Sequence, residues 1–177
     1  MISAPYILVF DVESVGLHGE GYAFGYVVHK TSTGEQVEEG IITCPSALAV
    51  GDASGREWIQ KHVDPHLPFP VEQTPHEVRT LAWQVLTRWS VRGAVIFVDW
   101  GWPVEARFLA RCVDDDLRRK TMISPIQEIA TVVELAGAGE DSARRPEELP
   151  LHNPRSDARH SLRILLQALA RLQRRTP

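Results

Sequence analysis

Short apolar runs in this chain are separated by longer segments in which apolar residues recur every three or four positions. A run that is apolar at every position, such as YILVF at Tyr6–Phe10, is typical of a strand buried on both faces. The residues Thr-Ser-Thr-Gly within Lys30–Glu35 form a turn signal, so the first three strands should pair as an antiparallel meander. The predicted strands are Tyr6–Phe10, Gly21–His29, Gln36–Thr43, Ala94–Val98 and a short one at Thr121–Ser124.

Helices are predicted between and after these strands. Thr74 followed by Pro75 and Glu77 has the residues of a helix start, and leucines at helical spacing give the last helix one apolar face. Loops are expected at Leu67–Pro75 and, as a mobile segment, at Gly137–Pro150. The predicted helices run from Asp52 or Ser54 to about Val63, from Pro75 to about Trp89, from Pro103 to Asp114–Asp116, over Ile126–Leu135 and from Asp157 to Arg174. This order predicts an α/β fold, with a mixed sheet flanked by helices.

The composition is that of one ordinary folded domain, to which we assign residues 1–177. Apolar residues make up 44% and charged residues 24%, which excludes disorder, collagen and a coiled coil as descriptions of the whole chain. No apolar run approaches the ~20 residues of a membrane span. Met1–Tyr6 has no basic stretch before an apolar core, so we expect a cytoplasmic protein without a membrane partner. Cys44 and Cys112 are expected to be reduced and semi-buried.

Charge is unevenly distributed along a chain whose net charge is −4. Arg144–Pro177 holds eight Arg and three acidic residues, a balance of +5, which leaves −9 on the first 143 residues. This asymmetry indicates either a basic surface beside an acidic site or a solvated helix face with a basic C-terminus, and charge alone favours the second.

Asp11 and Glu13 follow the first apolar strand. Residues i and i+2 of a strand point to the same face, so both carboxylates should aim at one point. Two anions this close repel each other unless a cation or a proton lies between them, and Mg²⁺ prefers oxygen ligands. The pair therefore indicates a divalent metal site, although an Asp-x-Glu pattern also occurs by chance in turns.

Acidic residues stand at the ends of predicted elements in two further segments. DWGWPVEARFL at Asp99–Leu109 follows the strand Ala94–Val98, and HNPRSD at His152–Asp157 precedes the last helix. Together with DVESVGL at Asp11–Leu17, these segments resemble, in order, the three motifs of the DEDDh-type 3′→5′ exonucleases, most of all the small bacterial and phage exoribonucleases.

The second segment departs from the family pattern. The register of Phe108 and Leu109 puts Glu105 where the family has an Asp. Asp99, at the strand tip, is the alternative fourth carboxylate. We favour Glu105, because the first turn of a helix favours an anion.

The resemblance implies a ribonuclease H-like mixed five-stranded sheet, an antiparallel meander followed by two more strands. It also implies hydrolysis of phosphodiester bonds from the 3′ end of a single-stranded nucleic acid. Two Mg²⁺ ions, for which Mn²⁺ can substitute, would be held by carboxylates, with His152 as general base. Because His152 lies beside the expected mobile loop, it should point away from the acids in an empty structure. The implied metal ligands are Asp11, Glu13, Asp157 and either Glu105 or Asp99.

Further residues near the motifs are candidates for substrate binding. By resemblance, Leu17 would wedge against the terminal base, while Ser14 and Gly16 would offer donors to the terminal nucleotide. Trp100 and Trp102 would either stack bases or pack internally. Arg155 and Arg159, beside the third motif, would either hold phosphates or form a solvated helix face. The expected partner is a single strand, RNA or DNA, with a free 3′ end, and analogy with small relatives allows a homodimer.

Two other functions fit parts of this pattern. A phosphatase that forms an aspartyl-phosphate also has an acid after a strand, but it needs an active-site Lys, the chain has only Lys30, Lys61 and Lys120, and this function would leave the pair His152 and Asp157 unexplained. A catalytically decayed binding module of the same fold would account for Glu105 in place of Asp. Metal binding distinguishes this alternative from the enzyme.

Overall fold

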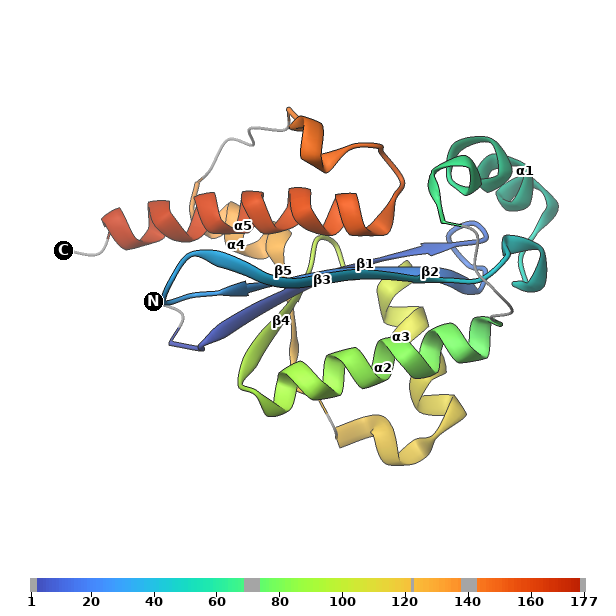
Figure 1. The fold of residues 1–177 in the computed structure, drawn as a ribbon, viewed down its shortest axis with the longest axis horizontal. Helices are drawn as coiled ribbons and strands as arrows, with labels where there is room; N and C mark the ends of the chain where they lie inside the picture. The colour runs from blue at the N-terminus through green and yellow to red at the C-terminus, as the bar shows by residue number, and fades with distance from the viewer. Residues whose placement is uncertain (1–2, 69–73, 122, 138–142, 176–177) are drawn as a thin grey trace.

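The structure is a computed structural model that describes residues 3–68, 74–121, 123–137 and 143–175. Its strands form one mixed sheet in the order β3-β2-β1-β4-β5 (Figure 1). The first three strands pair antiparallel, β4 runs parallel to β1, and β5 runs parallel to β4. The predicted mixed five-stranded sheet is therefore confirmed. The strands are β1 (Tyr6–Ser14), β2 (Gly21–Lys30), β3 (Glu35–Thr43), β4 (Ala94–Val98) and β5 (Ile126–Glu128).

Helices cover both faces of this sheet. In Figure 1, α4 and α5 lie on one face, α2 and α3 lie on the other, and α1 lies near the end of β1. The helices are α1 (Ala53–His62), α2 (Pro75–Val91), α3 (Val104–Asp115), α4 (Ile129–Leu135) and α5 (Pro154–Arg175). Thr74 caps α2 and Pro75 is its first residue, as the sequence predicts, and Glu77 completes a reciprocal capping box with Thr74.

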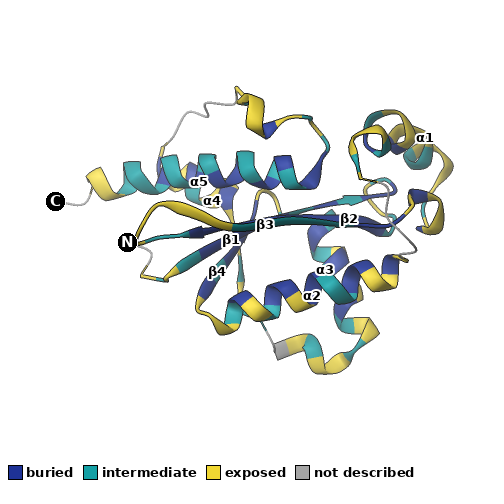
Figure 2. Ribbon diagram, viewed as in Figure 1, coloured by how far each residue is buried: buried dark blue, intermediate teal, exposed yellow. Residues whose placement is uncertain are grey.

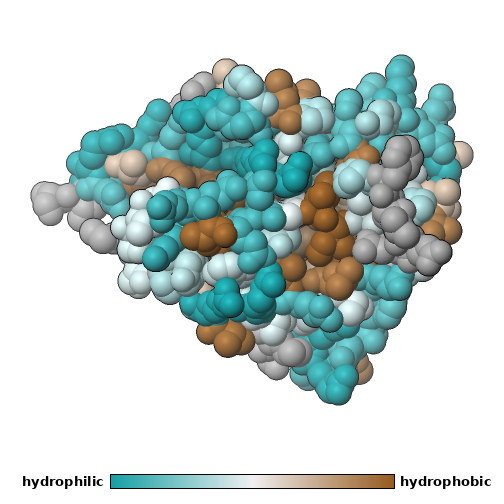
Figure 3. Space-filling model, viewed as in Figure 1, coloured by the Kyte–Doolittle hydropathy of each residue, from teal (hydrophilic) through white to brown (hydrophobic). Residues whose placement is uncertain are grey.

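The continuous apolar runs are explained by two cores, one on each face of the sheet. Leu8, Phe10 and Val12 of β1 pack on the face of α2 and α3, whereas Ile7 and Val9 pack on the face of α4 and α5. Figure 2 shows the central strands buried and the outer sides of the helices exposed. On the face seen in Figure 3, most of the surface is hydrophilic, and hydrophobic residues gather over the sheet between α5 and α2.

The last strand is not where the sequence pattern predicts it. Thr121 ends a 3₁₀-helix (Leu117–Thr121), and Met122 lies outside the described residues, so the predicted strand at 121–124 is wrong. The strand is instead β5, which occupies the start of the predicted helix Ile126–Leu135 and leaves α4 to begin at Ile129. Pairing with β4 decides this, because Ile126–Glu128 extend the sheet along Ile96–Val98. Neighbouring strands override helical periodicity over so short a segment.

The final helix begins three residues earlier than predicted. Its first residue is Pro154, and the Oδ1 of Asn153 accepts a hydrogen bond from the Ser156 amide at 3.2 Å. Asn153 therefore caps the helix, and Asp157 lies within its first turn. In the predicted loop 137–150, residues 138–142 lie outside the described part, and Pro146–Glu148 form a 3₁₀ turn, η4. Residues 69–73 of the predicted loop 67–75 also lie outside it.

Both cysteines are free and more deeply buried than expected, with Cys44 2% and Cys112 0% exposed. Burial raises the pKa of each thiol to about 12. Within the described ranges, no helix combines the length and the apolar character needed to cross a membrane.

Candidate active site

Carboxylates gather at the edge of the sheet where the parallel strands β1 and β4 end. The last residues paired between these strands are Val9 and Phe97. Two positions after them in the chain are Asp11, which is still on β1, and Asp99, which directly follows β4. β1 continues beyond its apolar run to Ser14, so Asp11 and Glu13 share one face of a strand, as their spacing predicts. The carboxyl ends of parallel strands are the edge at which such sheets bind ligands.

The first turn of α5 brings Asp157 to this edge. A carboxylate oxygen from each of Asp11, Glu13 and Asp157 lies within 4.8 Å of the others, and we call these three residues the acid cluster. Gly25 makes the approach of α5 possible, because it pairs with Asp11 across the ladder. A Cβ at this position would lie 2.1 Å from the Arg155 amide nitrogen and 2.2 Å from the Pro154 carbonyl carbon. Only a glycine therefore fits beneath this helix start.

Burial raises the pKa of every acid in the cluster, and neighbouring carboxylates raise the pKa of Asp11 and Glu13 further. Burial raises the pKa of Asp11 well above its usual value, and the nearby charges of Glu13, Glu105, Asp157 and Asp99 raise it further. Burial, with Asp157 and Glu105, also raises the pKa of Glu13. The pKa of Asp157 is raised by burial, although neighbouring cations oppose this shift. A divalent cation would relieve this repulsion, and carboxylate oxygens are the ligands that Mg²⁺ prefers, so the cluster fits such an ion.

Both candidates for the fourth carboxylate lie near the cluster. Glu105, in the first turn of α3, is buried, and its carboxylate accepts a hydrogen bond from the Val12 amide between Asp11 and Glu13. Burial raises the pKa of Glu105 to about 7. Asp99 is exposed and raises the pKa of Asp11 and of Glu105. The choice of Glu105 as a metal ligand stays a prediction.

His152 lies beside the acids. Its Nδ1 is 4.0 Å from the Oε1 of Glu13, and its ring packs edge-on against Trp58 with centroids 4.9 Å apart. The expectation that it points away is therefore wrong. The backbone of His152 is left-handed, with a φ of 60°, a conformation that neighbouring contacts must hold. Asn153 supplies one of them, since its Nδ2 donates to the His66 carbonyl oxygen at 2.9 Å.

No protein-family model and no curated protein matches this chain, whereas solved structures do. The nuclease domain of 3′hExo, a DEDDh family member bound to rAMP, is 14% identical at a TM-score of 0.53, over 96% of this chain and 94% of that one. Exonuclease I is 12% identical at a TM-score of 0.56, over 99% of this chain but only 42% of its own. A 3′-exonuclease with 3′-end specific recognition of a histone mRNA stem-loop is 13% identical at a TM-score of 0.50, over 94% and 82%.

This chain has the ribonuclease H-like fold of the DEDDh exonucleases. At such low identities the likeness establishes the exonuclease fold, and the chemistry must be argued from the side chains.

A cavity of about 300 Å³ opens beside the acid cluster in this exonuclease fold. Ser14, Gly16 and Leu17 line it, as does Glu13 of the cluster, and Leu17 is 64% exposed. Trp58 of α1 forms another wall and links this cavity to His152. Trp58 was not predicted as a site residue, because it lies outside all three motifs and only the fold brings α1 to this edge.

The remaining predicted substrate residues separate into two groups. Trp100 and Trp102 are 73% and 70% exposed, so they are available to stack bases and are not packed internally. Arg159 instead pairs with Glu39 of β3, and Arg155 lies near enough to Glu39 to lower the pKa of that carboxyl. Positions two apart on a helix point in nearly opposite directions, so these arginines face away from Asp157.

Arg144 is a second residue that the motifs did not identify. Its Nη1 pairs with the Oδ1 of Asp157 and donates to the Glu148 carbonyl oxygen at 3.1 Å. The excess of arginine after residue 143 was the signal in the sequence, but it did not distinguish Arg144 from its neighbours.

Proposed function

We propose that this chain is a metal-dependent 3′→5′ exonuclease that hydrolyses phosphodiester bonds at the 3′ end of single-stranded RNA or DNA. The observation that carries this proposal is the convergence of Asp11, Glu13 and Asp157 within 4.8 Å, with His152 4.0 Å from Glu13. The exonuclease fold supports it, since this convergence lies at the carboxyl edge of β1 and β4.

The acid cluster, with Glu105 or Asp99 as the fourth carboxylate, would hold two Mg²⁺ or Mn²⁺ ions. When bound, such ions supply Lewis acidity to an attacking water and to the departing 3′ oxygen. Two divalent ions would also balance the charge of four carboxylates. An acidic site would then accept a polyanionic strand.

His152 is the general base of the proposed reaction. Histidine is the side chain that most often serves as a general base in enzymes. His152 accepts the proton of the water that attacks phosphorus, the bond from phosphorus to the 3′ oxygen breaks, and that oxygen takes a proton from solvent. The products are a nucleoside 5′-monophosphate and a strand with a new 3′ hydroxyl.

The cavity beside the acids accounts for attack at a strand end. Its volume of about 300 Å³ suits one nucleotide and not a duplex, and its walls include the apolar side chains of Leu17 and Trp58. These side chains would contact the terminal base, and Trp100 and Trp102 would stack neighbouring bases.

A degradation assay tests the proposal. Purified protein is incubated with 5′-labelled single-stranded RNA or DNA and Mg²⁺ or Mn²⁺, beside Asp11→Asn and the control Asp114→Asn, an exposed acid of α3. We expect a ladder that shortens from the 3′ end, is lost with EDTA, and is slower by at least about a thousandfold in Asp11→Asn only. If the protein binds RNA or DNA but leaves it intact with both metals, the binding-module alternative is supported. Glu105 in place of Asp would then explain the loss of catalysis.

A further inference from the structure

Asp157 already has a cationic partner from the chain itself. The guanidinium of Arg144 contacts its Oδ1, and both side chains are largely buried, at 21% exposed for Arg144 and 14% for Asp157. An ion pair in this environment is screened by solvent less than a surface pair. Arg144 therefore occupies one oxygen of a carboxylate that the proposed function assigns to a metal ion.

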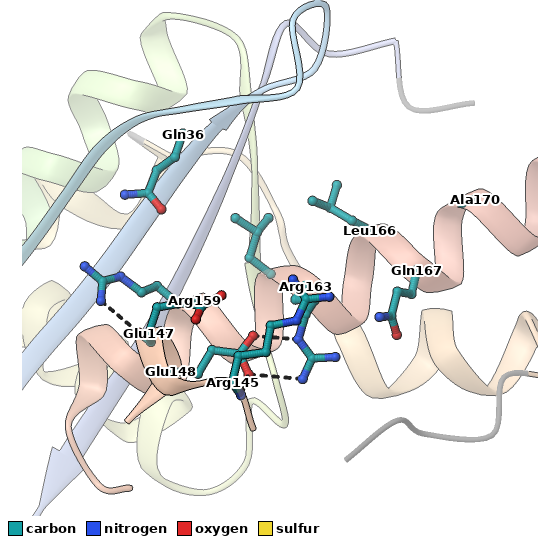
Figure 4. Close-up of a pocket in the computed structure, with 10 residues that line it drawn as sticks. Gln36, Arg145, Glu147, Glu148, Arg159, Arg163, Leu166, Gln167 and Ala170 are labelled. Carbon is teal, nitrogen blue, oxygen red and sulfur yellow. Dashed lines mark hydrogen bonds and ion pairs between the residues drawn. The ribbon is translucent and has the colours of Figure 1, made fainter. Parts of the chain in front are cut away.

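The turn η4 holds Arg144 in this position. The second acceptor of Arg144 is the Glu148 carbonyl oxygen, and the Glu148 side chain is anchored on α5. Its carboxylate accepts hydrogen bonds from the Arg163 Nε at 2.5 Å and from the Arg145 amide at 3.0 Å, and it lies 2.9 Å from the His160 Nδ1. Figure 4 shows Glu148 bonded to Arg163 in the wall of a separate cavity of about 660 Å³. The loop before α5 is thus fixed close to the acid cluster.

A guanidinium and a divalent ion cannot both use this carboxylate fully. They share the charge of one carboxylate and repel each other at close range, where the effective dielectric constant is low. Metal binding at Asp157 must therefore weaken or break its pair with Arg144. The released guanidinium would stay within the site, because its donor to the Glu148 carbonyl keeps it tethered there.

We propose that Arg144 is a phosphate-binding residue whose guanidinium is held on Asp157 until divalent metal displaces it toward the phosphate of the bound strand. This inference rests on the proposed function. The planar fork of donors in arginine matches two phosphate oxygens, and such charge-assisted bonds are strong. The exchange keeps a cation on Asp157 in the metal-free protein and supplies one to the substrate in the loaded protein.

Metal binding without substrate tests the first half of the exchange. Calorimetry measures Mn²⁺ affinity for the wild type, for Arg144→Gln and for the control Arg145→Gln, which removes the same charge from the next residue. We expect Arg144→Gln to bind Mn²⁺ roughly tenfold more tightly and Arg145→Gln to resemble the wild type. Arg144→Lys, which keeps the charge, should stay near the wild type, and thermal unfolding verifies that each variant folds. Equal or weaker Mn²⁺ binding by a folded Arg144→Gln overturns the inference.

Binding of a nucleoside 5′-monophosphate in saturating Mg²⁺ tests the second half. We expect Arg144→Gln to lose about tenfold in affinity for the monophosphate and nothing for the unphosphorylated nucleoside. An equal loss for both ligands, or no loss, refutes the phosphate contact. If the wild type neither binds Mn²⁺ nor shortens a strand, the proposed function itself fails. If it does both and Arg144→Gln binds Mn²⁺ as the wild type does, only the role of Arg144 fails.

Discussion

Glu105 is the residue at which this chain departs from the family motif that it resembles. Its carboxylate reaches the amide of Val12, between two acids of the cluster, so the longer side chain still arrives at the metal edge from the first turn of α3. Burial in this position disfavours the charged form of Glu105. The ionisation of Glu105 should therefore lower the stability of the folded protein, and this effect can be measured without substrate.

The raised pKa of Glu105 makes the stability of the metal-free protein depend on pH. The unfolded chain releases this proton near pH 4.5, whereas the folded protein keeps it to about 7, so the folded state binds more protons between these values and stability falls as pH rises through them. Glu105→Gln stays neutral and can still accept from Val12. We expect it to be more stable than the wild type above pH 7, on the order of 3 kcal/mol, and similar to it below pH 4.5.

Urea unfolding in EDTA at a series of pH values measures this difference. Glu57→Gln, an exposed position of α1, is the control and should follow the wild type throughout. If the free energies of unfolding of Glu105→Gln and the wild type change with pH in the same way, Glu105 ionises in the folded protein at no cost in stability.

At the scale of elements, the site depends on how closely α5 approaches the sheet. Gly25 of β2 lies under the start of this helix and opposite Asp11. The atoms that a new Cβ would meet belong to the backbone of Pro154 and Arg155, which cannot turn aside as a flexible side chain can. The helix, and Asp157 with it, would have to move.

We therefore expect Gly25→Ala to destabilise the protein by about 1–3 kcal/mol or more and to weaken Mn²⁺ binding. Gly34→Asn serves as the control, because nothing lies within 4 Å of a Cβ there and asparagine tolerates its φ of +75°. Urea unfolding measures the stability of each variant, and calorimetry measures its affinity for Mn²⁺. A Gly25→Ala protein with unchanged metal affinity would show that the acid cluster does not depend on the position of α5.

The elements also indicate which features a sequence can predict. The meander, the start of α2 at Thr74 and Pro75, and the shared face of Asp11 and Glu13 were predicted correctly, because each depends on residues close together in the chain. The position of the last strand was predicted wrongly, because pairing with β4 decides which residues form β5. Trp58 and Arg144 were missed for a related reason, since neither belongs to a motif and only the fold brings α1 and the loop before α5 to the acids.

For the whole molecule, the acid cluster is a source of instability that ligand binding should remove. Burial raises the pKa of Asp11, Glu13 and Asp157, and repulsion by neighbouring acids adds to it for Asp11 and Glu13, so ionising the cluster in the folded protein costs free energy. A divalent ion that binds only the folded state adds about 2.7 kcal/mol at a concentration ~100 times its dissociation constant. For a domain of this size that corresponds to roughly 5–10 °C in Tm.

We expect Mn²⁺ or Mg²⁺ to raise the Tm by about this amount at pH 7–8, and EDTA to reverse the rise. Asp11→Asn should lose most of the rise, because it removes a carboxylate to which both other acids lie close. Asp114→Asn, on the exposed side of α3, should keep it. Sodium chloride at matched ionic strength separates specific binding from general screening, since salt screens surface charges whether or not a site exists. A rise of equal size in sodium chloride, or in Asp11→Asn, would exclude the acid cluster as a metal site and with it the proposed hydrolysis.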